Sequence, residues 1–105
     1  MTHDKESEVI SLRHASDGVL KFRKLLKLYP RFNGLWDFHK SRVNLEQAEQ
    51  ALTVHSHGEC IMLRFFLAVW LGENRHNFDI IDAVRVLDLE DLDRITDWMK
   101  SPFWP

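Results

Sequence analysis

An almost continuous apolar run from Cys60 to Leu71, broken only by Arg64, constrains this chain most strongly. Ser56 and Glu59 precede it at the spacing of a capping box, which satisfies the free backbone groups of a helix's first turn. The sequence therefore predicts a helix from His57 to Leu71. Because nearly every side of this helix is apolar, neighbouring elements must cover it almost all round. The run is shorter than the roughly 20 residues that cross a bilayer, so it predicts a core helix and no membrane association.

The size and composition of the chain indicate one globular domain over residues 1–105. The chain has 105 residues, of which 45% are hydrophobic, and this range supports a single core. Seven Phe and four Trp supply enough apolar area to need no disulfide. Residues 1–8 are polar and mixed in charge, so we expect them to be disordered and to carry no secretory signal. With one cysteine in the chain, the cytoplasm is the expected compartment.

Apolar periodicity and capping residues predict the helices that cover the central one. The elements expected in chain order are a helix between Ser16 and Pro30, a turn at Asn33-Gly34, a short helix capped by Asn44, a helix over Phe78–Leu87 and a last helix capped by Asp88. The last helix is expected to point Leu89, Leu92, Ile95 and Met99 inward. The fold class is therefore all-α, a bundle of about five helices around the helix from His57 to Leu71.

Two short segments leave alternatives open. Val9–Arg13 alternates apolar and polar residues over too few positions to separate a strand from a helix. Phe103 and Trp104 follow a helix stop at Ser101-Pro102 and would expose a large aromatic area if left loose. They either fold back onto the bundle or fill a pocket on a second copy, so the protein is a monomer or a homodimer, and we favour the fold-back.

The charges are unevenly distributed along the chain. Between Gly18 and Val43 seven basic residues face one acid, Asp37, whereas between Glu73 and Lys100 eight acids outnumber four bases. The last two helices could form a helix-turn-helix, but the charges disfavour DNA binding by it. Its recognition helix would be acidic and would repel phosphate. Any contact with nucleic acid must therefore use the first helix.

The basic side of the first helix is the candidate binding site. Its residues are Leu20, Lys21, Arg23, Lys24, Lys27 and Leu28. Such a run is usually a solvated face, but two leucines among the bases favour a partner surface. The leading hypothesis is a non-enzymatic protein-interaction or regulatory module whose partner is another protein with an acidic surface. The alternative is a nucleic-acid-associated protein that uses the same basic face.

An enzymatic or metal-binding role ranks third. His55, His57 and Cys60 lie close together in the sequence, but their spacing differs from the paired ligands of structural zinc sites. Cys60 in a helix's first turn with His57 as base would be a nucleophile, although a lone cysteine before an apolar run is more often a small core residue. No common phosphate, dinucleotide or hydrolase motif occurs. We therefore expect no catalytic residues, metal or cofactor.

The second half of the chain resembles a small family of bacterial and mobile-element proteins without an assigned activity. The resemblance covers Ser56 to Trp104 and consists of a Ser-x-Gly-Glu start, an apolar helix with a tryptophan near its end, and a Leu-Asp turn. The matching residues are Ser56, Gly58, Glu59, Arg64, Phe65, Trp70, Gly72, Leu87, Asp88 and Trp98. It implies a helical fold and transfers no active site.

Overall fold

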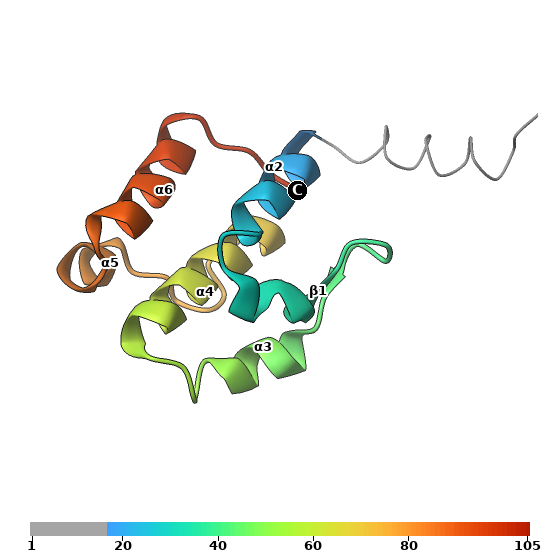
Figure 1. Cartoon of the computed structure of the whole chain (residues 1–105), viewed down its shortest axis with the longest axis horizontal. Coiled ribbons are helices and arrows are strands. Elements are labelled where there is room, and N and C mark those ends of the chain that lie inside the picture. The colour runs from blue at the N-terminus through green and yellow to red at the C-terminus, as the bar shows by residue number, and fades with distance from the viewer. Residues whose placement is uncertain (1–16) are drawn as a thin grey trace, which may run out of the picture.

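Helix α4 (His57–Leu71) lies at the centre of the computed structural model, which describes residues 17–105 (Figure 1). Its start is the expected capping box: the Ser56 side chain accepts a hydrogen bond from the Glu59 amide, and the Glu59 carboxylate accepts one from the Ser56 amide. Gly72 ends the helix in the left-handed conformation, with φ of 70°, where glycine carries no steric penalty. The predicted helix is therefore confirmed at both ends.

The remaining elements surround α4 as a helical bundle (Figure 1). In chain order they are α2 (Asp17–Leu26), the 3-10 helix η1 (Pro30–Leu35), strands β1 (Trp36–Asp37) and β2 (Arg42–Val43), α3 (Leu45–Ala51), α5 (Ile80–Val86) and α6 (Leu89–Lys100). The all-α class is confirmed, with one small two-stranded sheet added. No helix among residues 17–105 is long and apolar enough to cross a membrane.

Local side-chain caps fix where three of these helices begin. The Asn44 side chain accepts from the Gln47 amide at the start of α3, and Asp88 accepts from the Asp91 amide at the start of α6. Asp79 likewise accepts from the first-turn amides of α5. Each cap satisfies backbone donors that a helix cannot pair internally. The predicted caps at Asn44 and Asp88 are therefore confirmed.

The core is an aromatic cluster centred on Phe66 of α4. Its ring lies 5.7 Å from that of Phe22 on α2 and 5.1 Å from that of Tyr29. Phe32 of η1 and Trp36 of β1 contact the same ring, at 6.3 and 6.5 Å. The rings meet mainly edge to face, the arrangement that aromatic quadrupoles favour. One α4 residue thus ties together the elements of the first half of the chain.

The segment between α2 and α3 differs from the sequence expectation. Asn33-Gly34 lies inside η1 and makes no separate turn, while β1 pairs antiparallel with β2 through Trp36 and Val43. Strands this short carry too few residues to show a period, so the pattern of the sequence could not reveal them. Burial of the Trp36 ring against the core holds the hairpin in place.

Helix α6 is less buried than its apolar stripe predicts. Ile95 is fully buried and Leu92 packs against the core, but Leu89 is 78% exposed and Met99 is 44% exposed. The expectation that all four point inward was therefore wrong for Leu89 and Met99. An apolar stripe indicates which side of a helix faces inward, whereas the reach of its neighbours decides how much of the stripe is covered.

The last residues fold back onto the bundle. Phe103 packs against the core, and its carbonyl oxygen accepts a 3.0 Å hydrogen bond from Trp98 Nε1. The Trp104 ring lies edge-on to Trp98, and the chain ends beside the start of α2 (Figure 1). This is the favoured fold-back. Three sequence expectations fall on residues that the structure does not describe: the start of the first helix at Ser16, the open assignment of Val9–Arg13 and the disorder of residues 1–8.

Candidate functional site

The structure exposes every residue of the candidate site on α2 and the turn that follows it. These residues are Leu20, Lys21, Arg23, Lys24, Lys27 and Leu28. Lys21 forms a 3.0 Å ion pair with Asp17, and the Arg23 guanidinium lies over the Phe38 ring. Lys24 and Lys27 have no acidic partner within residues 17–105. Two lysine charges and two leucine side chains, Leu20 and Leu28, thus face solvent together.

A groove of about 300 Å³ separates α2 from α6 and uses half of this candidate site. Lys21, Lys24 and Leu28 form one wall. The floor and the opposite wall consist of Leu25, Arg94, Asp97, Trp98, Ser101 and Phe103. Leu20, Arg23 and Lys27 lie outside the groove. The structure therefore brings three of the six predicted residues together around a floor of apolar side chains.

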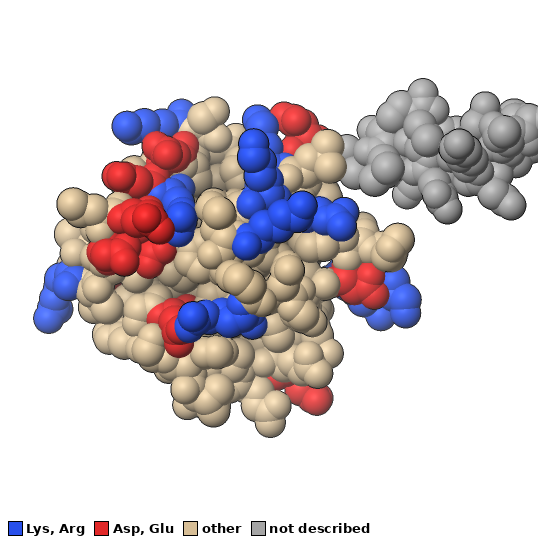
Figure 2. Space-filling model, in the orientation of Figure 1, with Lys and Arg blue, Asp and Glu red and all other residues tan. Residues whose placement is uncertain are grey.

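The basic and acidic parts of the sequence become neighbours on one face of the molecule. Figure 2 shows Lys and Arg side chains gathered over α2, and over the adjacent α6 it shows Asp and Glu side chains with a few basic side chains beside them. The exposed acids of α6 are Glu90, Asp93 and Asp97. In the groove itself, Lys21 and Lys24 lie on the α2 wall, and Asp97 lies on the α6 wall beside Arg94, which pairs with Glu90. We call this surface, with the basic residues of α2 on one side and Glu90, Asp93 and Asp97 of α6 on the other, the two-signed face. It is wider than the basic face that the sequence indicated.

A half-buried polar bridge joins Tyr29, in the turn after α2, to α6. The Tyr29 hydroxyl donates to Asp91 Oδ1, and Arg94 Nη1 donates to the Tyr29 hydroxyl at 3.1 Å. Burial raises the pKa of the Tyr29 phenol, and the Asp91 carboxylate raises it further. The hydrogen bond to Tyr29 in turn raises the pKa of Arg94. The bridge fixes the spacing of the two helices that form the groove.

No sequence pattern indicates this bridge. The helical period of the first helix groups Tyr29 with its apolar residues, and Asp91 lies 62 positions away in the chain. No local motif links residues so far apart in sequence. The neighbouring Glu90–Arg94 pair, by contrast, has the four-residue spacing that predicts an ion pair on a helix, and the structure places the two groups 3.0 Å apart.

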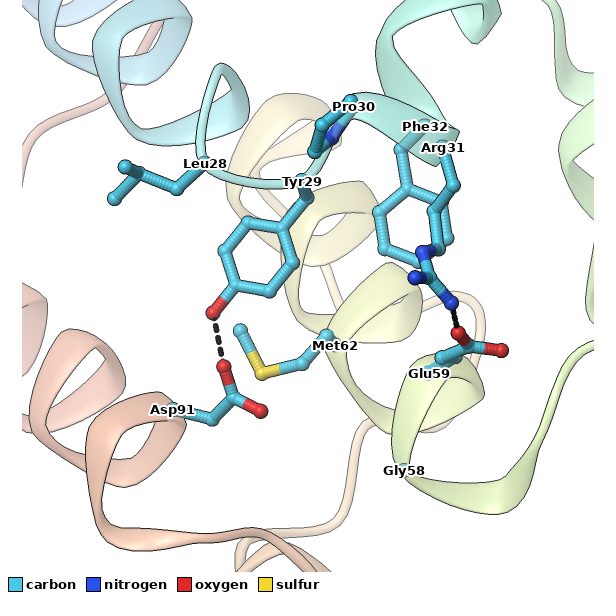
Figure 3. Close-up of a pocket in the computed structure, with 9 residues that line it drawn as sticks. All are labelled: Leu28, Tyr29, Pro30, Arg31, Phe32, Gly58, Glu59, Met62 and Asp91. Atoms are coloured by element: carbon cyan, nitrogen blue, oxygen red, sulfur yellow. Dashed lines mark hydrogen bonds and ion pairs between the residues drawn. The ribbon is translucent and has the colours of Figure 1, made fainter.

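A second hollow, of about 290 Å³, lies on the other side of the bridge. Figure 3 shows Tyr29 directed at Asp91 on one side and Arg31 paired with Glu59 on the other, with Met62 of α4 between them. Because its charged groups pair across it, this hollow has little charge left for a ligand. Leu28 lines both hollows and lies between them.

The histidines and the cysteine near the start of α4 point to different partners. His55 Nδ1 lies 3.3 Å from Glu59, while His57 Nε2 lies 2.8 Å from Asp82 on α5. The buried Cys60 thiol donates to the backbone carbonyls of Leu52 and His55. In the described part of the chain, no three His, Cys, Asp or Glu side chains come together as metal ligands. This geometry supports neither a metal site nor a Cys60–His57 nucleophile.

The Tyr29 bridge predicts a pH dependence of stability. Because the folded state raises the pKa of Tyr29 above its ordinary value of 10.0, the stabilisation is complete below pH 10 and is lost as the pH rises beyond it, where the unfolded phenol ionises first. Tyr29→Phe should cost about 1 kcal/mol at neutral pH. It should also flatten the decline in unfolding free energy between pH 9.5 and 11, measured by urea denaturation. If the unfolding free energy fell equally with pH in the wild type and in Tyr29→Phe, the bridge would be contradicted.

Comparisons with protein-family models, curated proteins and solved structures found no match. The resemblance of Ser56 to Trp104 therefore gains no support from them.

Proposed function

We propose that this chain is a non-enzymatic protein-interaction module that binds a protein partner through α2 and the α2–α6 groove. One observation carries the proposal: exposed Leu28 and the lysines of α2 border an open groove with an apolar floor. Exposed leucines cost free energy in water, and a partner that buries them recovers it. As a module without a disulfide, it is expected to work in the cytoplasm.

The chemistry of the groove describes the segment that it would accept. A volume of about 300 Å³ holds one or two apolar side chains against Leu25, Trp98 and Phe103. Lys24 and Lys27, which lack acidic partners among residues 17–105, favour carboxylates on the flanks of that segment. An amphipathic helix with a short apolar stripe and acidic neighbours combines both features.

Nucleic acid fits this surface less well than protein does. Glu90, Asp93 and Asp97 on α6 lie beside the basic side chains of α2, and a phosphate backbone tracking α2 would pass these carboxylates (Figure 2). An apolar groove floor adds nothing to phosphate binding. Binding to oligonucleotides is therefore measured as the result that would contradict the protein-partner proposal.

The test measures binding to a displayed library of random helical peptides. We expect enriched peptides to combine leucine or phenylalanine with acidic residues, and Lys24→Glu with Lys27→Glu to weaken them about tenfold or more. Leu28→Ala should weaken them comparably. Arg85→Glu and Ile81→Ala, both exposed on α5, are the matched controls and should change nothing.

Two results would overturn the proposal. The first is peptide enrichment that ignores the charge reversals and Leu28→Ala but responds to the α5 controls. The second is salt-sensitive binding to duplex or single-stranded oligonucleotides that is indifferent to Leu28, which would establish the nucleic-acid function instead. Circular dichroism of each variant checks that folding is unchanged.

A further inference from the structure

The two-signed face restricts which partner can cover it. A partner with a uniformly acidic surface would match the lysines of α2 but would meet Asp93 and Asp97 on the adjacent helix, where Glu90 is already paired with Arg94. Like charges brought together at an interface cost several kcal/mol of binding free energy. A partner that covers both helices must therefore carry acids opposite α2 and bases opposite α6.

We propose that this partner is a second copy of the chain, docked face to face about a two-fold axis that runs along the α2–α6 groove. The inference rests on the proposed function and names the partner for the same surface. The chain itself carries both charges on either side of a groove with an apolar floor. Among residues 17–105, Lys24 on α2 and Asp93 and Asp97 on α6 are unpaired. Arg94 on α6 is neutralised by Glu90. These are the features that a complementary partner needs.

The direction of the symmetry axis follows from the charges. Rotation by half a turn about an axis parallel to the groove exchanges the two sides, so α2 of each copy lies on α6 of the other. Lys24 then faces Asp97 of the second copy, and the contact occurs twice, while Lys21 keeps its own partner, Asp17. An axis across the groove would instead place α2 on α2 and bases on bases. Charge complementarity therefore selects the parallel axis.

The same arrangement buries the exposed apolar side chains of the groove. Leu28 lines the groove and is 53% exposed. In the dimer it meets the equivalent groove of the second copy, whose floor is Leu25, Trp98 and Phe103. Apolar contact at the centre with charged pairs at the rim is the usual anatomy of a protein interface. The polar bridge of Tyr29 holds the two helices at the spacing that this contact requires.

A charge-swap experiment tests the dimer. Analytical ultracentrifugation of the full chain from micromolar to millimolar concentration should show a monomer–dimer equilibrium that weakens with salt. Lys24→Glu and Asp97→Lys should each weaken self-association at least tenfold. The double variant K24E/D97K should recover it, and an equimolar mixture of the two single variants should form a mixed dimer more tightly than either variant alone. Arg85→Glu should leave the equilibrium unchanged.

The outcomes separate this inference from the proposed function. A wild-type chain that stays monomeric throughout would overturn the second copy as partner, and the peptide-library result would then decide the proposed function by itself. A dimer that ignores both single charge changes, or one that the double variant fails to restore, would overturn the groove as its interface. Thermal unfolding of each variant confirms that lost association is not lost folding.

Discussion

Replacing Phe66 with alanine should lower the free energy of unfolding by about 3–5 kcal/mol. Phe66 has no exposed surface, and its ring contacts aromatic rings from α2, η1 and β1. The substitution removes the transfer free energy of a whole phenyl ring and leaves a cavity among rigid neighbours that cannot close in. Since domains of this size are commonly stable by about 5–15 kcal/mol, the variant should lose a large share of its stability.

Urea denaturation followed by circular dichroism measures this loss. Val54→Ala is the control, because Val54 is 77% exposed and its truncation should change stability by within about 0.5 kcal/mol. A Phe66 variant as stable as the control would mean that the aromatic cluster is not the core. The bundle would then need another centre, and α4 would lose its role as the element that the others cover.

The central helix could be predicted because its signals are local. Ser56 and Glu59 satisfy their own neighbouring amides, and the left-handed Gly72 stops the helix within one residue. The same holds for the caps at Asn44 and Asp88. In each case the residue and its hydrogen-bond partner lie within a single turn, so the sequence contains the whole interaction.

What depends on tertiary contacts could not be predicted in the same way. Leu89 and Met99 belong to the apolar period of α6, yet the neighbouring elements leave them exposed. The hairpin of Trp36 and Val43 exists because the tryptophan ring is buried against Phe22 and Phe66. Neither fact follows from a local pattern, since both depend on which distant side chains arrive at the same place.

The candidate site likewise has a part that could be predicted from local sequence and a part that depends on tertiary contacts. The exposed bases and leucines of α2 were visible as an amphipathic pattern, because a helical period places Lys24 and Leu28 on the side opposite Phe22. The groove was not visible, because its other wall comes from Asp97 and Trp98 at the far end of the chain. The charge asymmetry between two parts of the sequence became a property of one face only when α6 packed beside α2.

Gly18 tests whether the last residues of the chain pack against α2. A β-carbon at Gly18 would lie 2.1 Å from the carbonyl oxygen of Trp104 and 3.2 Å from the backbone nitrogen of Pro105. Backbone atoms cannot move aside as a flexible side chain would. Although alanine favours a helix over glycine by about 1 kcal/mol, Gly18→Ala should therefore destabilise the protein by about 1–3 kcal/mol.

Deleting residues 103–105 should reverse the sign of the change in unfolding free energy that Gly18→Ala causes. With the obstructing backbone gone, Gly18→Ala should stabilise the shortened chain by up to about 1 kcal/mol, the ordinary gain in a helix. Gly34→Ala is the matched control, because a β-carbon there meets nothing within 4 Å, and its effect should be the same in both backgrounds. A full-length Gly18→Ala protein more stable than the wild type would show that the terminal residues do not lie against α2. Phe103 would then no longer be held by that contact as part of the groove floor, so the same measurement bears on the proposed binding surface.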